Sequence, residues 1–127
     1  MCKIILKYGD IFTIDIGMEW PYTGPKDGEG YYTDTALTVP IGKIPPKTIQ
    51  LLNVTQESLE AGIKAIKPGN TIADIGRAIE DYVKSQGKYG IVRDLVGHGV
   101  GHAVHEEPRI PNFYERNLDY FVIKAGM

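Results

Sequence analysis

DIFTIDIG, residues 10–17, and YYTDTALTV, residues 31–39, decide the fold. Both stretches are rich in β-branched or aromatic residues, which favour strands, and the first stops at a glycine. Between them, residues 18–30, MEWPYTGPKDGEG, carry two prolines and three glycines, which is typical of an extended loop. We therefore predict a hairpin whose loop is far longer than the usual connection of about two to five residues.

One aspartate stands in the middle of each predicted strand, Asp15 in the first and Asp34 in the second. Because alternate side chains share a face of a strand, Asp15 points with Thr13, and Asp34 points with Tyr32. If the strands pair, the two carboxylates can meet on one face, where at about 4 Å they repel by about 4 kcal/mol. A divalent cation between them, or protonation of one acid, relieves this repulsion. The alternative is that each aspartate faces solvent or satisfies a turn.

A first helix is expected in the middle of the chain. It should begin near the pair Pro45-Pro46 and end before Lys67, because proline suits the first turn of a helix. Its apolar residues recur at helical spacing and are expected to face the core: Leu52, Leu59, Ile63 and Ile66.

A second helix should follow directly. Asn70 or Thr71 is the expected N-cap, and Asp74 stands where a capping box needs an acid. Gly87 is the expected stop. The apolar stripe of this helix consists of Ile72, Ile75, Ile79, Tyr82 and Val83.

All three histidines lie within eight residues of the last third, which is otherwise expected to be irregular. His98 and His102 are four residues apart, as in helical zinc pairs, but glycines at 97, 99 and 101 disfavour a helix. These glycines instead let the backbone approach a site closely. We expect His98 to be a metal ligand, His105 a hydrogen-bond donor to a bound group, and His102 an ordinary partly buried histidine.

The composition is that of one globular domain. The 127 residues, 14.1 kDa, include 43% hydrophobic residues, and 14 Lys and Arg stand against 16 Asp and Glu. This near balance gives no electrostatic reason to expect nucleic acid or a membrane surface as a partner. Cys2 is the single cysteine, and the apolar run at residues 4–6 is too short for a signal peptide or a membrane span. The expected location is the cytoplasm.

Four blocks of the sequence carry a family resemblance: GDIFTIDIG, YYTDTALTVPIGK, KPGNTIADIGRAIEDYV and VRDLVGHGVGHAVHEEPRIPN. In identity, order and spacing they resemble the type I methionine aminopeptidases of the M24 metallopeptidase family, over about residues 9–127. The resemblance implies an α+β pita-bread fold, in which a curved antiparallel sheet has helices on its outer face. It also implies removal of the N-terminal methionine from nascent polypeptides, through activation of water by two divalent ions such as Co, Mn, Fe or Zn.

The same resemblance assigns roles to single residues. It implies that Asp15, Asp34 and His98 are metal ligands, with Asp34 bridging both ions. His105 matches the catalytic histidine that contacts the scissile bond of the substrate and steadies the transition state.

Two departures from the family pattern bear on these expectations. Two glutamate ligands of the family and its N-terminal segment have no counterpart in residues 1–127, which we expect to form a single, incomplete M24 catalytic domain. Residues 20–29 look like an insertion between the aspartates, and the pair Glu106-Glu107 is not a ligand pair in the family. One alternative is a non-catalytic pita-bread module that binds peptides or a protein, and another is a soluble domain with structural aspartates. Uncovered sheet edges favour self-association.

Overall fold

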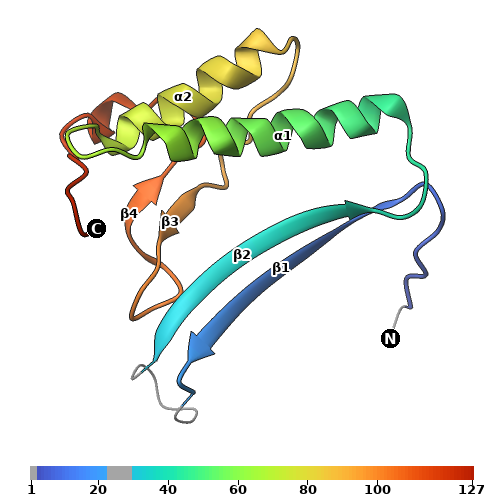
Figure 1. Cartoon of the computed structure of the whole chain (residues 1–127), viewed down its shortest axis with the longest axis horizontal. Coiled ribbons are helices and arrows are strands. Elements are labelled where there is room, and N and C mark those ends of the chain that lie inside the picture. Colours follow the sequence, from blue (N-terminus) through green and yellow to red (C-terminus); the bar gives the residue numbers. More distant parts are fainter. Residues whose placement is uncertain (1–2, 23–29) are drawn as a thin grey trace. The chain divides into compact units, whose positions relative to one another are not determined.

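The computed structural model describes residues 3–22 and 30–127, and Figure 1 labels its helices and strands. The elements along the chain are β1 (Ile11–Trp20), β2 (Tyr31–Pro40), α1 (Pro46–Ala65), α2 (Ile72–Ser85), β3 (Gly97–Gly99), β4 (Glu106–Ile110) and the 3-10 helix η1 (Arg116–Leu118). The described residues group into two compact units. The first unit runs up to Asn53 and also contains Val100–Val104, and the second contains Val54–Gly99 and His105–Met127.

β1 and β2 form the predicted hairpin, and the two strands curve together along their length (Figure 1). They pair antiparallel, with Trp20 opposite Tyr31 at the loop end. The prediction that the loop begins at residue 18 is wrong, because residues 18–20 continue the ladder. Pro21 follows β1 and has no N–H to donate to a ladder. The predicted insertion at residues 20–29 lies outside the described residues from residue 23 onward.

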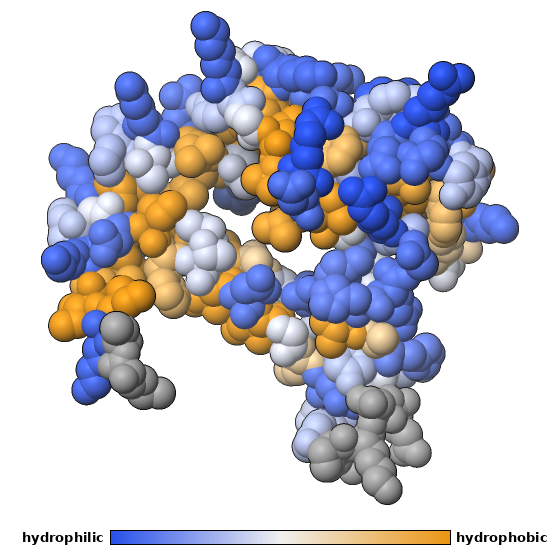
Figure 2. Space-filling model, turned by 180° about the vertical axis from the view of Figure 1, so that it is seen from behind, coloured by the Kyte–Doolittle hydropathy of each residue, from blue (hydrophilic) through white to orange (hydrophobic). Residues whose placement is uncertain are grey.

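The two faces of the hairpin differ in polarity. One face carries Thr13, Asp15, Gly17 and Glu19 of β1. The opposite face carries large apolar side chains that are 41% to 73% exposed, namely Phe12, Ile14, Ile16, Met18 and Trp20. Figure 2 shows apolar side chains gathered along the hairpin. An exposed apolar patch of this extent is typical of a surface that another element or molecule covers.

α1 begins at Pro46 and ends at Ala65, as predicted, but it buries a different face from the predicted one. Its buried residues are Val54, Ser58 and Gly62, whereas the expected core residues Leu59, Ile63 and Ile66 are about half exposed. The reason is close packing on α2, because a Cβ on Gly62 would lie 2.9 Å from the side chain of Ile79. At Gly62 the two helices therefore approach each other closely. Within residues 3–22 and 30–127, neither α1 nor any other helix is long and apolar enough to cross a membrane.

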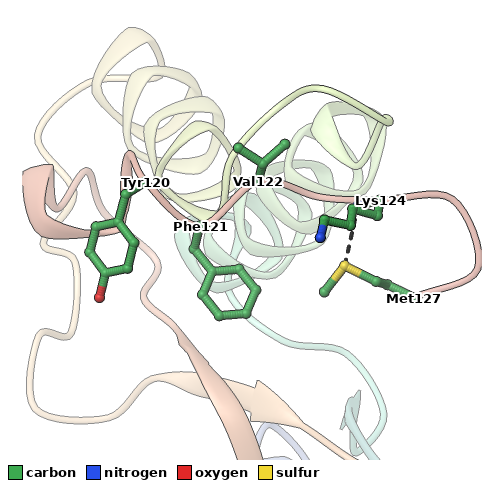
Figure 3. Close-up of a pocket in the computed structure, with 5 residues that line it drawn as sticks. All are labelled: Tyr120, Phe121, Val122, Lys124 and Met127. Carbon is green, nitrogen blue, oxygen red and sulfur yellow. Dashed lines mark hydrogen bonds between the residues drawn. The ribbon is translucent and has the colours of Figure 1, made fainter.

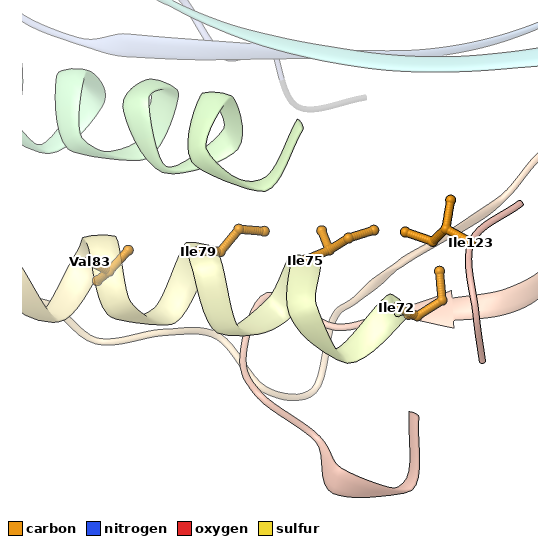
Figure 4. Close-up of a cluster of buried hydrophobic side chains, with 5 residues drawn as sticks. All are labelled: Ile72, Ile75, Ile79, Val83 and Ile123. Carbon is orange, nitrogen blue, oxygen red and sulfur yellow. The ribbon is translucent and has the colours of Figure 1, made fainter. Parts of the chain in front are cut away.

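α2 confirms the predicted cap and most of the predicted stripe. The Thr71 side chain accepts the N–H of Asp74, and the Asp74 carboxylate accepts the N–H of Thr71, which completes a capping box. Gly87 has a φ of +122°, as expected just beyond a helix end. Four stripe residues point to one side of α2 and meet a residue of the C-terminal segment (Figure 4). This core cluster consists of Ile72, Ile75, Ile79, Val83 and Ile123.

The last third contains more regular structure than predicted. β3 and β4 pair antiparallel, with His98 opposite Arg109 and a register shift between His98 and Gly99. The expectation of an irregular segment is wrong here because strands of three and five residues are too short to show an alternating pattern. The prediction that the glycine-rich segment is not a helix is confirmed.

Candidate metal site and histidine pair

The strand register places Asp15 and Asp34 on the same face of the hairpin. Asp15 lies opposite Ala36, and Asp34 lies opposite Gly17, so the two aspartates are diagonal neighbours across the ladder. Diagonal neighbours in an antiparallel pair have Cα atoms about 7–8 Å apart, which lets side chains reach a shared ligand. Both aspartates are exposed. This arrangement suits a cation, because two carboxylates on one exposed face attract positive charge.

Glu19 adds a third carboxylate to this face, and it is not among the residues predicted from the sequence. It lies opposite Tyr32 in the ladder. Asp34 therefore has two diagonal neighbours on β1, Asp15 on one side and Glu19 on the other. Its Oε1 atom is buried and has no hydrogen-bond partner in the part of the chain that the structure describes. Gly30 packs on it so tightly that a Cβ there would lie 2.6 Å from the Glu19 Cγ. Extending the period-two pattern past Gly17 would have identified this residue.

His98 and His105 lie side by side in the second unit. Their ring centroids are 4.3 Å apart and the rings are tilted by 50°. The Nδ1 of His98 lies 3.0 Å from the carbonyl oxygen of Gly99, and a carbonyl only accepts, so this bond favours the tautomer with the proton on Nδ1. In that tautomer Nε2 carries the lone pair that binds a metal ion.

Tight backbone packing explains the glycine next to His98. A Cβ on Gly99 would lie 2.6 Å from the carbonyl oxygen of Glu107, an overlap with backbone that a larger residue could not avoid. The backbone of β4 therefore approaches Gly99 closely. The Glu107 carboxylate accepts the N–H of Arg109 at 3.2 Å, a local bond that occupies this side chain.

His102 differs from its prediction. It is exposed rather than partly buried, because it belongs to the irregular segment Val100–Val104 of the first unit. Its ring contacts the ring of Tyr31, with centroids 5.0 Å apart and planes tilted by 40°. Beside this contact, the N–H of Tyr32 donates to the carbonyl oxygen of Gly101 at 2.7 Å.

The predicted ligands are distributed over both units. Asp15 and Asp34 belong to the first unit, and His98 belongs to the second together with His105. Among residues 3–22 and 30–127, no three His, Cys, Asp or Glu side chains lie close enough together to hold a metal ion. The carboxylate pair fits a divalent cation in donor chemistry, but two ligands are fewer than the four of a typical transition-metal site. The three-residue ligand set therefore stays a prediction.

A cavity of about 460 Å³ lies elsewhere, in the C-terminal segment of the second unit (Figure 3). The backbone N–H of Lys124 donates to the Met127 sulfur at 3.2 Å at its wall. The residues that line it are mainly apolar and include no predicted site residue: Tyr120, Phe121, Val122, Lys124 and Met127. Its lining contains no carboxylate, histidine or cysteine side chain.

Comparison with known proteins gives the chain a family. Residues 2–127 match the model of metallopeptidase family M24. The methionine aminopeptidase of Borreliella burgdorferi is 43% identical over 122 residues, which cover 96% of this chain and 45% of that protein. The methionine aminopeptidase structure from Thermotoga maritima matches with a TM-score of 0.82 at 38% identity, covering 97% of this chain and 45% of that one. Prolidase from Pyrococcus furiosus matches with a TM-score of 0.72 at 27% identity, covering 96% and 32%.

These matches confirm the predicted fold class and the resemblance to methionine aminopeptidases. The fold is the α+β pita-bread fold of the matched peptidases, and the chain contains part of it. The chain spans less than half the length of the relatives described above. Because the family model covers nearly every residue, the chain belongs to metallopeptidase family M24.

Proposed function

We propose that the chain is a single, incomplete M24 catalytic domain, residues 1–127, of a metal-dependent methionine aminopeptidase. The observation that carries the proposal is the shared hairpin face of Asp15 and Asp34, in a chain whose relatives are named methionine aminopeptidases. The substrate would be the N-terminal methionine of a nascent polypeptide. Its location would then be the cytoplasm, where such polypeptides are made.

Asp15, Asp34 and His98 would hold the divalent ions, with Asp34 bridging two of them. Carboxylates with one imidazole suit Co, Mn, Fe or Zn. Such ions, when bound, lower the pKa of a water molecule toward neutrality and polarise a peptide carbonyl. Two carboxylates leave the charge of two divalent ions under-compensated, so we expect the 127-residue chain to bind these ions weakly.

His105 would act on the substrate. Its side chain is exposed, so a peptide can reach it, and its ring rests against that of the proposed ligand His98. An imidazole N–H aimed at the scissile bond would stabilise the charge that develops there in the transition state.

The test is release of methionine from a short Met-Ala-Ser peptide by the 127-residue chain, followed by mass spectrometry. We expect release only after addition of Mn²⁺ or Co²⁺, and loss of release in Asp34→Asn and His98→Ala. Asp81→Asn removes an exposed carboxylate on α2 and should leave release unchanged. Metal-independent release, or full activity of Asp34→Asn, would contradict the proposal.

A second function is favoured by the lack of any three-ligand group among residues 3–22 and 30–127. The chain would then be a non-catalytic pita-bread module that binds a peptide or a protein. In that case the same Met-Ala-Ser peptide binds without losing its methionine, and the affinity measured by calorimetry is the same in Asp34→Asn. The two functions are therefore distinguished by two measurements, release of methionine and peptide affinity. Each is made on the native chain and on Asp34→Asn.

A further inference from the structure

Arg109 lies next to the two predicted site histidines of the second unit. In the ladder of β3 and β4 it is directly opposite His98. Directly opposite residues of an antiparallel pair point to the same face, with Cβ atoms about 4.5–5.5 Å apart. The His105 ring in turn rests against the His98 ring, with centroids 4.3 Å apart. All three residues belong to the second unit, so a peptide at His105 would lie close to the base of the Arg109 side chain.

The alternation of side chains along β4 turns Arg109 away from the core. Its neighbour Ile110 is partly buried and packs against the core cluster of the second unit. Because successive side chains of a strand point to opposite faces, Arg109 points to the other face, and its side chain is 46% exposed. A peptide on the histidine face can therefore reach the guanidinium.

Glu115 holds this guanidinium through one nitrogen. The Nη1 of Arg109 donates to the Glu115 carboxylate at 2.7 Å. The neighbouring carboxylate of Glu107 accepts the backbone N–H of Arg109 at 3.2 Å. Within residues 3–22 and 30–127, Nε and Nη2 of Arg109 have no hydrogen bond or ion pair. Since arginine carries five N–H donors in a planar fork that matches a carboxylate, the Glu115 contact orders the side chain and leaves donors for a second carboxylate.

We propose that Arg109 is a specificity-determining residue that binds a carboxylate of the peptide, on the C-terminal side of the bond to be cleaved. The inference rests on the proposed function for the place of that bond beside His105. An extended peptide spans about 3.3–3.6 Å per residue, so a carboxylate on the third residue lies about 7 Å beyond the bond, a distance that a long side chain on this face can bridge. The carboxylate is the chain end of a tripeptide or the side chain of an aspartate at the third position.

The test compares Met-Ala-Ser with its C-terminal amide, by titration calorimetry on the metal-free 127-residue chain. We expect the acid to bind about three- to tenfold more tightly than the amide, because the fork of Arg109 is half exposed and already held. Arg109→Gln should remove this difference. Arg116→Gln, which changes an exposed arginine of η1, is the matched control and should preserve it. Equal affinity for acid and amide in the native chain, binding of neither, or a difference that survives in Arg109→Gln would overturn the inference.

A second pair of peptides separates the two sources of the carboxylate. Met-Ala-Asp amide and Met-Ala-Asn amide have the same shape and differ in one negative charge. Tighter binding of the aspartate peptide supports recognition of an acidic third residue. A preference confined to the Met-Ala-Ser acid supports recognition of the chain end of short peptides. No preference in either pair would overturn the inference.

Nuclear magnetic resonance gives a readout on the native chain, which does not require Arg109→Gln to fold. The Nε–H signal of Arg109 should shift as Met-Ala-Ser is added and stay in place as the amide is added. An unmoved signal at saturation with the acid would contradict the inference. Release of methionine is a separate outcome. A chain that prefers the acid through Arg109 but releases no methionine keeps the inference and loses the proposed catalysis. A chain that binds both peptides equally and releases methionine from both keeps the catalysis and loses the inference.

Discussion

Glu80 is a buried carboxylate that joins three parts of the second unit. One oxygen accepts the N–H of Tyr114 at 2.9 Å, and the other lies 3.2 Å from Arg93 and 3.0 Å from Lys84. The Tyr114 N–H, with help from the two cations, lowers the pKa of Glu80 below its ordinary value of 4.5, although burial acts in the opposite direction. The ionised side chain therefore stabilises the fold.

Glu80→Gln should lower the free energy of unfolding by about 1–3 kcal/mol at pH 7, because the buried partners lose a charged acceptor. A carboxylate with a lowered folded-state pKa contributes stability above pH 4.5, and this contribution is lost as the pH falls through the folded-state pKa. The difference between native chain and variant should therefore shrink below pH 4.5 in urea unfolding experiments. Glu60→Gln, at an exposed position on α1, is the control. Equal stability of Glu80→Gln and the native chain at pH 7 would contradict this account.

At the same scale, local patterns in the sequence predicted some residue environments and not others. The alternation of side chains predicted the common face of Asp15 and Asp34, and the register confirms it. Glu19 was missed because the strand was expected to end at Gly17. Two of the three partners of Glu80, Arg93 and Tyr114, lie 13 and 34 residues away in the sequence, a separation over which no local pattern operates.

α2 depends on a glycine in its middle. A Cβ on Gly76 would lie 2.2 Å from the carbonyl oxygen of Phe113 and 2.9 Å from that of Pro111. Both obstacles are backbone atoms, which cannot turn away as a side chain can. The helix and the segment after β4 therefore pack at a distance that only glycine allows.

Gly76→Ala should destabilise the chain by about 1–3 kcal/mol, although alanine is intrinsically better in a helix by about 1 kcal/mol. Gly90→Ala is the matched control, because its Cβ would have no neighbour within 4 Å, and it should change stability by less than about 0.5 kcal/mol. Thermal unfolding followed by circular dichroism measures both variants. A Gly76→Ala chain as stable as the native one would mean that α2 does not pack this closely.

The elements themselves were largely predictable. Proline at the start of α1, the capping box of α2 and Gly87 are local signals, and each was confirmed. The buried face of α1 was not predictable, because the contact of Gly62 with Ile79 decides it and not the position of the large apolar residues. β3 and β4 escaped prediction because their pairing, and not their composition, makes them strands.

At the scale of the whole molecule, the large apolar side chains on one face of the hairpin are 41% to 73% exposed, and the matched relatives are more than twice as long as this chain. We expect the 127-residue chain to self-associate through this face and the open strand edges. Leu37→Lys, at a position that is 64% exposed on the apolar face, should shift the chain toward monomer in sedimentation velocity experiments. Gln56→Lys adds the same charge on α1 and should not. A chain that stays monomeric at all concentrations would contradict the expectation.

The central claim is that Asp15, Asp34 and His98 together bind a divalent cation, and titration calorimetry of Mn²⁺ into the 127-residue chain tests it most directly. The account predicts saturable binding that weakens by more than about tenfold in Asp34→Asn and in His98→Ala, since each change removes a ligand. Asp81→Asn, which removes an exposed carboxylate on α2, should bind as the native chain does. Absence of saturable binding, or the same affinity in the native chain, Asp34→Asn and His98→Ala, would contradict the claim.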